Sequence, residues 1–217
     1  MEKSAIIILI RNPILGCVKT RLAADIGRFN ALNVYKTLLS YTRKITNSID
    51  SSRLLFYSDF IDFNDEWEDG IYQKYLQFGN DFGEKMLNAF NTALTQHDLA
   101  VIIGSDCFEL NSEIIELAFK KLKNFDVVIG PAKDGGYYLM GLKKVYPELF
   151  QGKKWSTDSV LSETINTVKS LELSYSLLPV LGDIDTLEDL KESQLYIQLD
   201  LKSEKSKLEE GNHRENY

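Results

Sequence analysis

The sequence predicts an α/β fold in which helices cover both faces of a mostly parallel sheet. Short apolar runs alternate with longer segments of helical periodicity along most of the 217 residues. Such alternation is typical of strand–helix–strand units joined by right-handed crossovers. Several of the apolar runs contain no polar residue, as expected for strands that are covered on both faces. The predicted architecture therefore has three layers, α/β/α.

The elements follow one another in a regular order. We expect strands at Ala5–Ile10, Arg53–Ser58, Tyr72–Gln77, Ala100–Gly104, Asp126–Gly130, Tyr137–Leu142 and Leu173–Pro179. Helical periodicity predicts helices at Arg21–Ile49, Asp81–Thr95, Ser112–Leu122, Ser156–Leu171 and Thr186–Leu199. Because only a short turn precedes the sixth strand, we expect this strand to be an antiparallel member of the sheet.

Length and composition fit one globular domain over residues 1–200. Hydrophobic residues make up 44% and charged residues 26% of the chain, a balance that can bury a sizeable core. Residues 201–217 are polar, and we expect them to form a flexible tail. The apolar run near the N-terminus is too short to span a membrane and has no cleavage site, so we expect a cytoplasmic protein.

Charge and residue usage exclude several classes of function. A net charge of -7 argues against nucleic-acid binding, which needs a basic face. Cys17 and Cys107 are isolated, which excludes a disulfide framework or a zinc ribbon and predicts small buried thiols. With only His97 and His213, serine triads and zinc hydrolase sites are also unexpected. Carboxylates and backbone groups must therefore carry any chemistry.

The segment after the first strand is cationic. Residues 11–28 contain four cations and one aspartate, a formal charge of +3. Lys19 and Arg21 flank the expected helix start, where cations oppose the helix dipole, and a bound phosphate would turn this mismatch into an advantage. The segment from Arg11 onward is thus predicted to bind phosphate, or else it is a solvated basic loop. It contains no Walker motif.

Asp106 follows a buried strand, which places it at the sheet edge where open parallel sheets bind ligands. Magnesium holds substrate phosphates through only one or two protein carboxylates. The segment Gly182-Asp183-Ile184-Asp185-Thr186, after the last strand, is the expected source of a second carboxylate. Alternatively, Asp185 or Thr186 caps the following helix. We therefore expect a Mg²⁺ or Mn²⁺ site.

A second strand-to-helix turn contains Asn80, Asp81 and Gly83. Asn80 or Asp81 is a good N-cap for the helix that follows, which is the simpler interpretation. The glycines of this turn also leave room for a nucleobase or a ribose. The turn therefore has a structural and a ligand-binding interpretation.

Two later segments have the same ambiguity. Asp134, Gly135 and Gly136 precede Tyr137 and are typical of a hairpin turn, but adjacent glycines also let the backbone approach a substrate closely. In the segment that begins at Trp155, the indole either stacks on a sugar or fills the core, and Ser156 or Thr157 can cap the next helix.

Together these segments resemble a bacterial family. The chain is similar to the DUF2064 group of glycosyltransferase-like proteins, also called radical-SAM/selenodomain-associated transferase 1. The resemblance covers roughly residues 5–190 and rests on five motifs in register: Ile10-Arg-Asn-Pro13 with Gly16-x-Val-Lys19-Thr-Arg21, Gly79-x-Asp81-x-Gly83-x-x-Met86, Gly104-Ser-Asp106-Cys107, Gly130-Pro-Ala-x-Asp134-Gly-Gly-Tyr-Tyr138 and Trp155-Ser-Thr157.

The resemblance implies a GT-A fold, that of the nucleotide-diphospho-sugar transferases. It implies phosphate binding by Gly16, Lys19 and Arg21, and metal binding by Asp106 with a second ligand in the segment that begins at Asp185. The chain departs from the family pattern in three places: Cys17 replaces a lysine, Lys85 an arginine, and Phe108-Glu109 the pair Pro-Asp.

We therefore expect metal-dependent transfer of a sugar from a nucleotide sugar to an unknown small-molecule acceptor. Asp134 is the expected general base or sugar ligand, and the substrate pocket is expected to contain Gly135, Gly136, Tyr137 and Trp155. The alternatives are nucleotidyl transfer from an NTP to a phosphorylated small molecule, and a non-catalytic sugar-nucleotide-binding protein. The cation missing at Cys17 favours the sugar-nucleotide donor over an NTP. The oligomeric state is not predicted.

Overall fold

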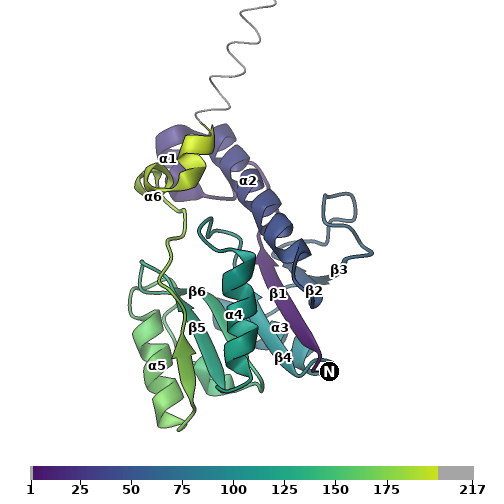
Figure 1. The fold of residues 1–217 in the computed structure, drawn as a ribbon. Helices are drawn as coiled ribbons and strands as arrows, with labels where there is room; N and C mark the ends of the chain where they lie inside the picture. Colours follow the sequence, from purple (N-terminus) through teal and green to yellow (C-terminus); the bar gives the residue numbers. More distant parts are fainter. Residues whose placement is uncertain (1, 200–217) are drawn as a thin grey trace, which may run out of the picture.

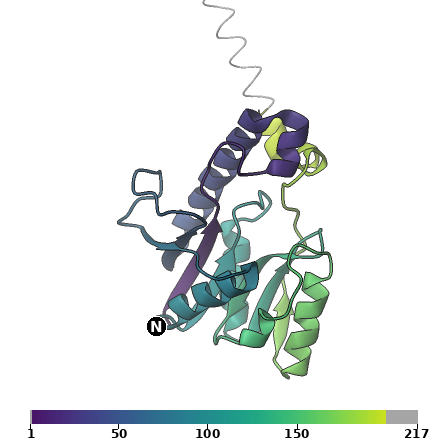
Figure 2. The same ribbon diagram turned by 180° about the vertical axis from the view of Figure 1, so that it is seen from behind.

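The computed structural model describes residues 2–199 and contains a seven-stranded sheet between two layers of helices (Figure 1, Figure 2). The strands are β1 Ser4–Ile10, β2 Ser52–Tyr57, β3 Tyr72–Leu76, β4 Leu99–Ile103, β5 Val127–Pro131, β6 Tyr137–Leu142 and β7 Tyr175–Leu177. Their order is β3-β2-β1-β4-β6-β5-β7, and β6 is antiparallel to both of its neighbours. The predicted fold class and the antiparallel member are confirmed.

Helices cover both faces of the sheet. The α-helices are α1 Thr20–Ile26, α2 Arg28–Asn47, α3 Phe82–Leu94, α4 Ser112–Leu122, α5 Val160–Ser170 and α6 Leu187–Glu192, and Pro147–Leu149 form a short 3-10 helix, η1. Successive strand residues face opposite layers: Ile6 and Ile8 pack in one cluster with α2 and α4, whereas Ile7 packs in another with α3 and α5. The sheet is therefore buried on both sides.

A third, smaller cluster lies beyond the carboxyl ends of the parallel strands. There α1 and α6 pack side by side against the start of α2 (Figure 1). Leu22 of α1 and Leu190 of α6 are buried together with Phe108 and Ile184. This cluster brings segments from the beginning and the end of the described chain together above the sheet edge.

Three predicted helices differ from the structure. The expected helix Arg21–Ile49 is two helices, because Gly27 has a φ of 82° and ends α1 before α2 begins. Ser193 adopts an extended backbone that interrupts the expected helix Thr186–Leu199 between α6 and helical residues 194–199. The expected helix Ser156–Leu171 begins only at Val160: Ser156 has a φ of 65°, outside the helical region, and in the first turn the Leu161 N–H donates to the Gly135 carbonyl.

Smaller differences concern the last strand and one cysteine. Only Tyr175–Leu177 of the expected strand Leu173–Pro179 pairs with β5. Cys107 is buried as expected, but Cys17 is exposed. Among residues 2–199, no helix is long and apolar enough to cross a membrane. The predicted tail, 201–217, lies outside the described residues.

Candidate functional site

Lys19 is the central cation of the site. Its Nζ lies 3.1 Å from Oδ2 of Asp106 and donates to Oδ1 of Asp185 at 2.8 Å. The Lys19 side chain is only 4% exposed. Burial alone would lower the pKa of Lys19, but the attraction of Asp106 and Asp185 outweighs it and the pKa is raised. Lys19 is therefore a protonated bridge between the two carboxylates that were predicted to bind metal.

The loop before α1 holds Lys19 in place. Lys19 has a left-handed backbone, with φ 48° and ψ 47°, an uncommon conformation for a residue with a side chain. Its neighbour Val18 is buried and anchors the loop. Arg21 is mostly exposed, and its guanidinium lies 3.6 Å from Asp185. The predicted basic loop therefore faces the predicted carboxylates, although they are far apart in the sequence.

Two buried polar residues tie this loop to neighbouring strands. The Tyr35 hydroxyl accepts from the Arg11 N–H at 2.9 Å and lies 3.3 Å from the Ser105 hydroxyl beside Asp106. The Asn12 side chain bonds to the turn after β2 through Asp59 and Phe60. These bonds set the position of the cationic loop relative to the sheet edge.

Asp183 belongs to the segment from which the sequence predicts a second carboxylate, but the predicted ligand was Asp185. It lies two residues before Asp185, and burial, with the nearby charges of Asp106 and Asp134, raises the pKa of its carboxyl to about 7. Lys19 opposes this shift but does not cancel it. The signal in the sequence was the run Gly182-Asp183-Ile184-Asp185, which offers a second carboxylate two residues from Asp185, a spacing that puts both on the same side of an extended segment.

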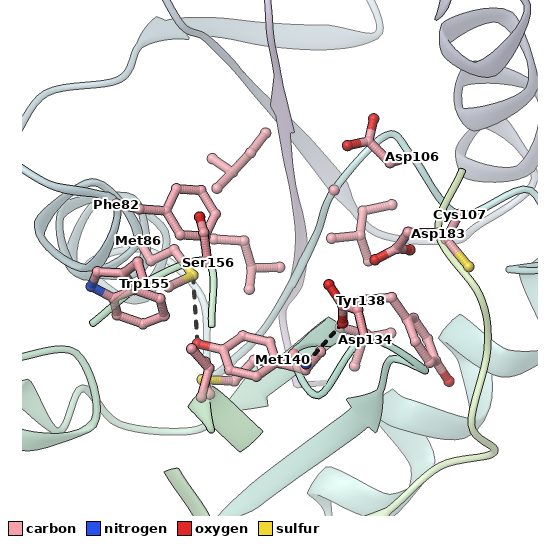
Figure 3. A pocket seen from close by; sticks show the side chains of 18 of the residues that line it. Phe82, Met86, Asp106, Cys107, Asp134, Tyr138, Met140, Trp155, Ser156 and Asp183 are labelled. Atoms are coloured by element: carbon pink, nitrogen blue, oxygen red, sulfur yellow. Dashed lines mark hydrogen bonds between the residues drawn. The ribbon is translucent and has the colours of Figure 1, made fainter. Parts of the chain in front are cut away.

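A cavity of about 260 Å³ opens at this edge of the sheet (Figure 3). At one end lie the carboxylates of Asp106, Asp134 and Asp183, which we call the carboxylate end. The other end, which we call the apolar end, is lined by Phe82, Met86, Tyr137, Met140 and Trp155. The cavity therefore has two walls of opposite chemical character.

The turn before β6 places Asp134 at the carboxylate end. Its Oδ1 accepts from the Gly136 N–H at 2.8 Å, so Asp134 stabilises the predicted turn. Gly135 has a φ of 87°, and a Cβ there would lie 2.2 Å from the Asp158 carbonyl oxygen. Ser156, which also lines the cavity, has a φ of 65° and does not cap the following helix, whose N-cap position is Ser159. Only a glycine at 135 lets these two loops meet beside the cavity.

The turn before α3 lies next to the apolar end. Asp81 is the N-cap of α3 and accepts from the Glu84 N–H at 2.8 Å, which confirms the simpler interpretation. Asn80 donates to the Glu84 carboxylate. Gly83 packs under Trp155, because a Cβ at this position would lie 2.7 Å from the indole ring. None of Asn80, Asp81 and Gly83 lines the cavity within residues 2–199, and nucleotide binding by them stays a prediction.

Trp155 presents ring carbons to the cavity. Its indole nitrogen lies on the side of the ring away from the carboxylates (Figure 3), beside Gly83, and has no hydrogen-bond partner among residues 2–199. Phe82 meets the indole edge-on, with ring centroids 5.6 Å apart. Met86 and Met140 are buried behind these rings. This wall provides contact surface without charge.

The donor atoms of the carboxylate end suit a hard divalent cation. No group of three or more His, Cys, Asp or Glu side chains within residues 2–199 forms a metal cage. Asp106 and Asp183 do face the same cavity, and Mg²⁺ takes its remaining ligands from water and substrate phosphates. Asp185 is already paired with Lys19 and Arg21. Asp106 and Asp183 therefore fit a metal better than Asp106 and Asp185.

Fold and site together define a transferase of the nucleotide-diphospho-sugar transferase fold. The chain belongs to DUF2064, a family described as an uncharacterized protein conserved in bacteria, whose model matches residues 42–157. The chain matches no curated protein.

Solved structures support this family. A protein from Desulfovibrio desulfuricans G20, provisionally assigned as a nucleotide-diphospho-sugar transferase, is 27% identical with a TM-score of 0.83, over 94% of this chain and 96% of that one. A 4-diphosphocytidyl-2C-methyl-D-erythritol synthase from Anaerococcus prevotii DSM 20548 has 13% identity and a TM-score of 0.56, over 91% and 99%. The inositol-1-phosphate CTP transferase from T. maritima has 13% identity and a TM-score of 0.55, over 90% and 94%. The last two share the fold alone.

Proposed function

We propose that this protein transfers a sugar from a nucleotide-diphosphate sugar to a small-molecule acceptor, with Mg²⁺ or Mn²⁺ as cofactor. The observation that carries the proposal is the meeting of Lys19, Asp106 and Asp183 at one edge of the sheet, beside a cavity. A cation next to two carboxylates matches the needs of a metal–diphosphate group. The similarity to the D. desulfuricans protein supports a sugar nucleotide as donor.

Asp106 and Asp183 would hold the metal in this proposal, which replaces Asp185 as the expected second ligand. When bound, the divalent ion neutralises the charge that develops on the leaving diphosphate. The metal requires Asp183 to be ionised, which its neighbours disfavour, so a bound cation relieves the repulsion among the carboxylates. Lys19 neutralises Asp185 and, with Arg21, is within reach of a phosphate at the start of α1.

The remaining site residues would act on the sugar and the acceptor. During transfer the bond between the anomeric carbon and the diphosphate oxygen breaks, and a bond to the acceptor forms. Asp134 uses one carboxylate oxygen for the Gly136 N–H and keeps the other to accept the acceptor proton. The nucleoside diphosphate leaves with the bonding electron pair. The backbone at Gly135 and Gly136 would then shape the sugar pocket.

A thermal-shift panel tests this proposal. UDP-, GDP-, ADP- and CDP-sugars are compared with NTPs, each with and without Mn²⁺, in the wild type and in Asp106→Asn and Asp183→Asn. We expect one sugar nucleotide to raise the melting temperature in a metal-dependent way, and both variants to lose the metal-dependent part. A response unchanged in both variants would show that the metal assignment is wrong.

Nucleotidyl transfer is the second candidate. Arg28 folds back over the cationic loop, where its Cδ would lie 3.5 Å from a Cβ at Gly16. A cation against Gly16, in the loop that also holds Lys19, favours a triphosphate. A metal-dependent response to an NTP alone, with pyrophosphate released on turnover, would favour this candidate over sugar transfer.

A further inference from the structure

We propose that the cavity binds a second substrate that is uncharged or carries an amine, that has an apolar ring or chain, and that is not a phosphate ester. This inference deepens the proposed function, on which it rests for the role of the cavity. It concerns the acceptor, which neither the family nor the similar structures identify.

The first argument is the charge of the cavity lining. Asp106, Asp134 and Asp183 line it, and among residues 2–199 no Lys, Arg or His does. Three cations near these carboxylates do not line the cavity. Lys19 is bound to Asp106 and Asp185, and Arg21 and Lys133, the latter paired with Glu109, line an adjoining cavity that shares Asp134 and Asp183 with this one. A phosphate ester in the cavity would face three carboxylates with no cation to pair with it.

The carboxylates already disfavour negative charge in one another. Asp106, Asp134 and Asp183 all face the same cavity (Figure 3). An added dianion would meet the same repulsion, whereas an ammonium would relieve it. One divalent ion would neutralise two of the three carboxylate charges, but the negative charge of the donor's diphosphate would in turn neutralise the ion. The cavity therefore stays unfavourable for a second phosphate.

The second argument is the apolar end. Phe82, Met86, Tyr137, Met140 and Trp155 form one wall, and the Tyr137 hydroxyl makes only a long contact, 3.8 Å, with the Met86 sulfur. The indole nitrogen of Trp155 lies away from the carboxylates (Figure 3). A ring or chain on this wall would bury apolar surface, since the Tyr137 hydroxyl is directed at the Met86 sulfur and the indole nitrogen is turned away. Its reactive hydroxyl or amine would then reach Asp134 across the cavity.

Three probes with the same ring test the inference: benzyl alcohol, benzylamine and benzyl phosphate. Binding is followed by the fluorescence of Trp155, and Trp155→Phe identifies the contribution of Trp67, the only other tryptophan. Titrations are made in EDTA and again with Mg²⁺ and a saturating nucleoside diphosphate. We expect the amine to bind at least as tightly as the alcohol, and the phosphate at least about tenfold more weakly, under both conditions.

Two variants separate the two arguments. Asp183→Asn removes one carboxylate charge at nearly constant side-chain volume. In EDTA it should reduce the ratio of the dissociation constants of benzyl phosphate and benzyl alcohol several-fold. Phe82→Ala should weaken binding of the alcohol and the amine several-fold, because Phe82 lines the cavity. The Phe82 side chain is 47% exposed, so its loss should leave the fold intact. Phe78→Ala is the matched control: Phe78 is 60% exposed, belongs to the same segment and does not line the cavity.

Two results would overturn the inference. One is that benzyl phosphate binds as tightly as benzyl alcohol under either condition, with a fluorescence change that is absent in Trp155→Phe. The other is that Phe82→Ala and Phe78→Ala bind the alcohol and the amine with equal affinity. Failure of the proposed function is a separate result. In that case the three probes keep the expected order while no nucleotide sugar binds in the presence of Mn²⁺.

Discussion

The two ends of the cavity are stabilised in opposite ways. The apolar end is close-packed, with Gly83 directly under Trp155 and Met86 and Met140 buried behind. The carboxylate end brings Asp106, Asp134 and Asp183 to one cavity, and the only cation that Asp106 contacts among residues 2–199 is Lys19. Packing therefore stabilises one end, whereas the other keeps an electrostatic repulsion that a bound cation would remove.

This difference indicates where the protein gives up stability for binding. A close-packed wall fixes the shape of the site before any ligand arrives, which lowers the entropy cost of binding. An unneutralised carboxylate costs stability in the free protein, and binding a cation recovers it. Substitutions at the close-packed positions of the apolar end should therefore destabilise the protein, whereas the right substitution at the carboxylate end should stabilise it.

Gly83→Ala should have the largest effect. A Cβ at this position would lie 2.2 Å from the Phe150 carbonyl oxygen and 2.7 Å from the Trp155 ring, so backbone must move. We expect a loss of about 2–3 kcal/mol in the free energy of unfolding, measured by urea denaturation. Gly104→Ala is the control, because no atom lies within 4 Å of its Cβ position. Equal losses in both variants would contradict the packing argument.

Lys19→Met should come next. It removes the buried cation between Asp106 and Asp185 while keeping most of the side-chain volume. Because these carboxylates are 42% and 41% exposed, water offsets part of the lost attraction, and we expect a loss of about 2 kcal/mol. Arg21→Met is the control, since Arg21 is 70% exposed and should lose less than about 0.5 kcal/mol. Similar unfolding midpoints for the two variants would show that Lys19 does not balance the carboxylate end.

The fold could be predicted further than the site. Apolar runs mark the strands because burial on both faces removes polar residues, and the expected helix Ser112–Leu122 has the same bounds in the structure. Gly27 was overlooked as a break because a glycine inside a long periodic segment is often tolerated. The overall α/β order thus follows from local patterns.

The charge pairing of the site could not be predicted from local patterns. Lys19 meets Asp106 and Asp185 only because α1 and α6 pack together above the sheet. Local geometry does not choose between Asp183 and Asp185, because residues two apart on an extended segment point to the same side. Tertiary contacts do: Asp185 is paired with Lys19 and Arg21, whereas Asp183 lines the cavity. The bond from the Ile184 N–H to the Asp106 carbonyl holds that segment, and nothing in the local sequence reveals it.

Asp183→Asn should stabilise the free protein at neutral and higher pH. The pKa of Asp183 is about 7 in the folded protein, against about 4 when unfolded, so its ionisation opposes folding. The wild type therefore loses stability as the pH rises from about 4 to 7, and the asparagine variant avoids this loss. We expect the variant to gain on the order of 1–2 kcal/mol at pH 8 in EDTA and almost nothing at pH 4.

Asp185→Asn provides the contrast for this prediction. This variant lacks the negative charge that accepts a hydrogen bond from Lys19 in the wild type, so it should be less stable than the wild type at pH 8. A loss of stability in Asp183→Asn at pH 8 would mean that Lys19 neutralises both aspartates, and the proposed difference between the two ends would fail.

Asp126→Asn should have the smallest effect, with the opposite pH dependence. Asp126 lies away from the cavity, where it accepts hydrogen bonds from Ser174 and lies 3.6 Å from Lys143. The Ser174 bonds are the main reason why the pKa of Asp126 is lowered, with Lys143 adding to the effect. Its contribution to stability is thus present above the unfolded pKa of about 4 and lost as the pH falls through the lowered value.

Solvent screens this carboxylate, so the variant should lose only about 0.5 kcal/mol at pH 7 and approach the wild type near pH 3. Urea midpoints at pH 3.5, 5 and 7 measure both pH dependences in one series. The difference between variant and wild type should grow with pH at both positions, as a loss for Asp126→Asn and as a gain for Asp183→Asn. If both variants were less stable than the wild type, or both more stable, the carboxylate end would not differ from an ordinary surface aspartate in its electrostatics.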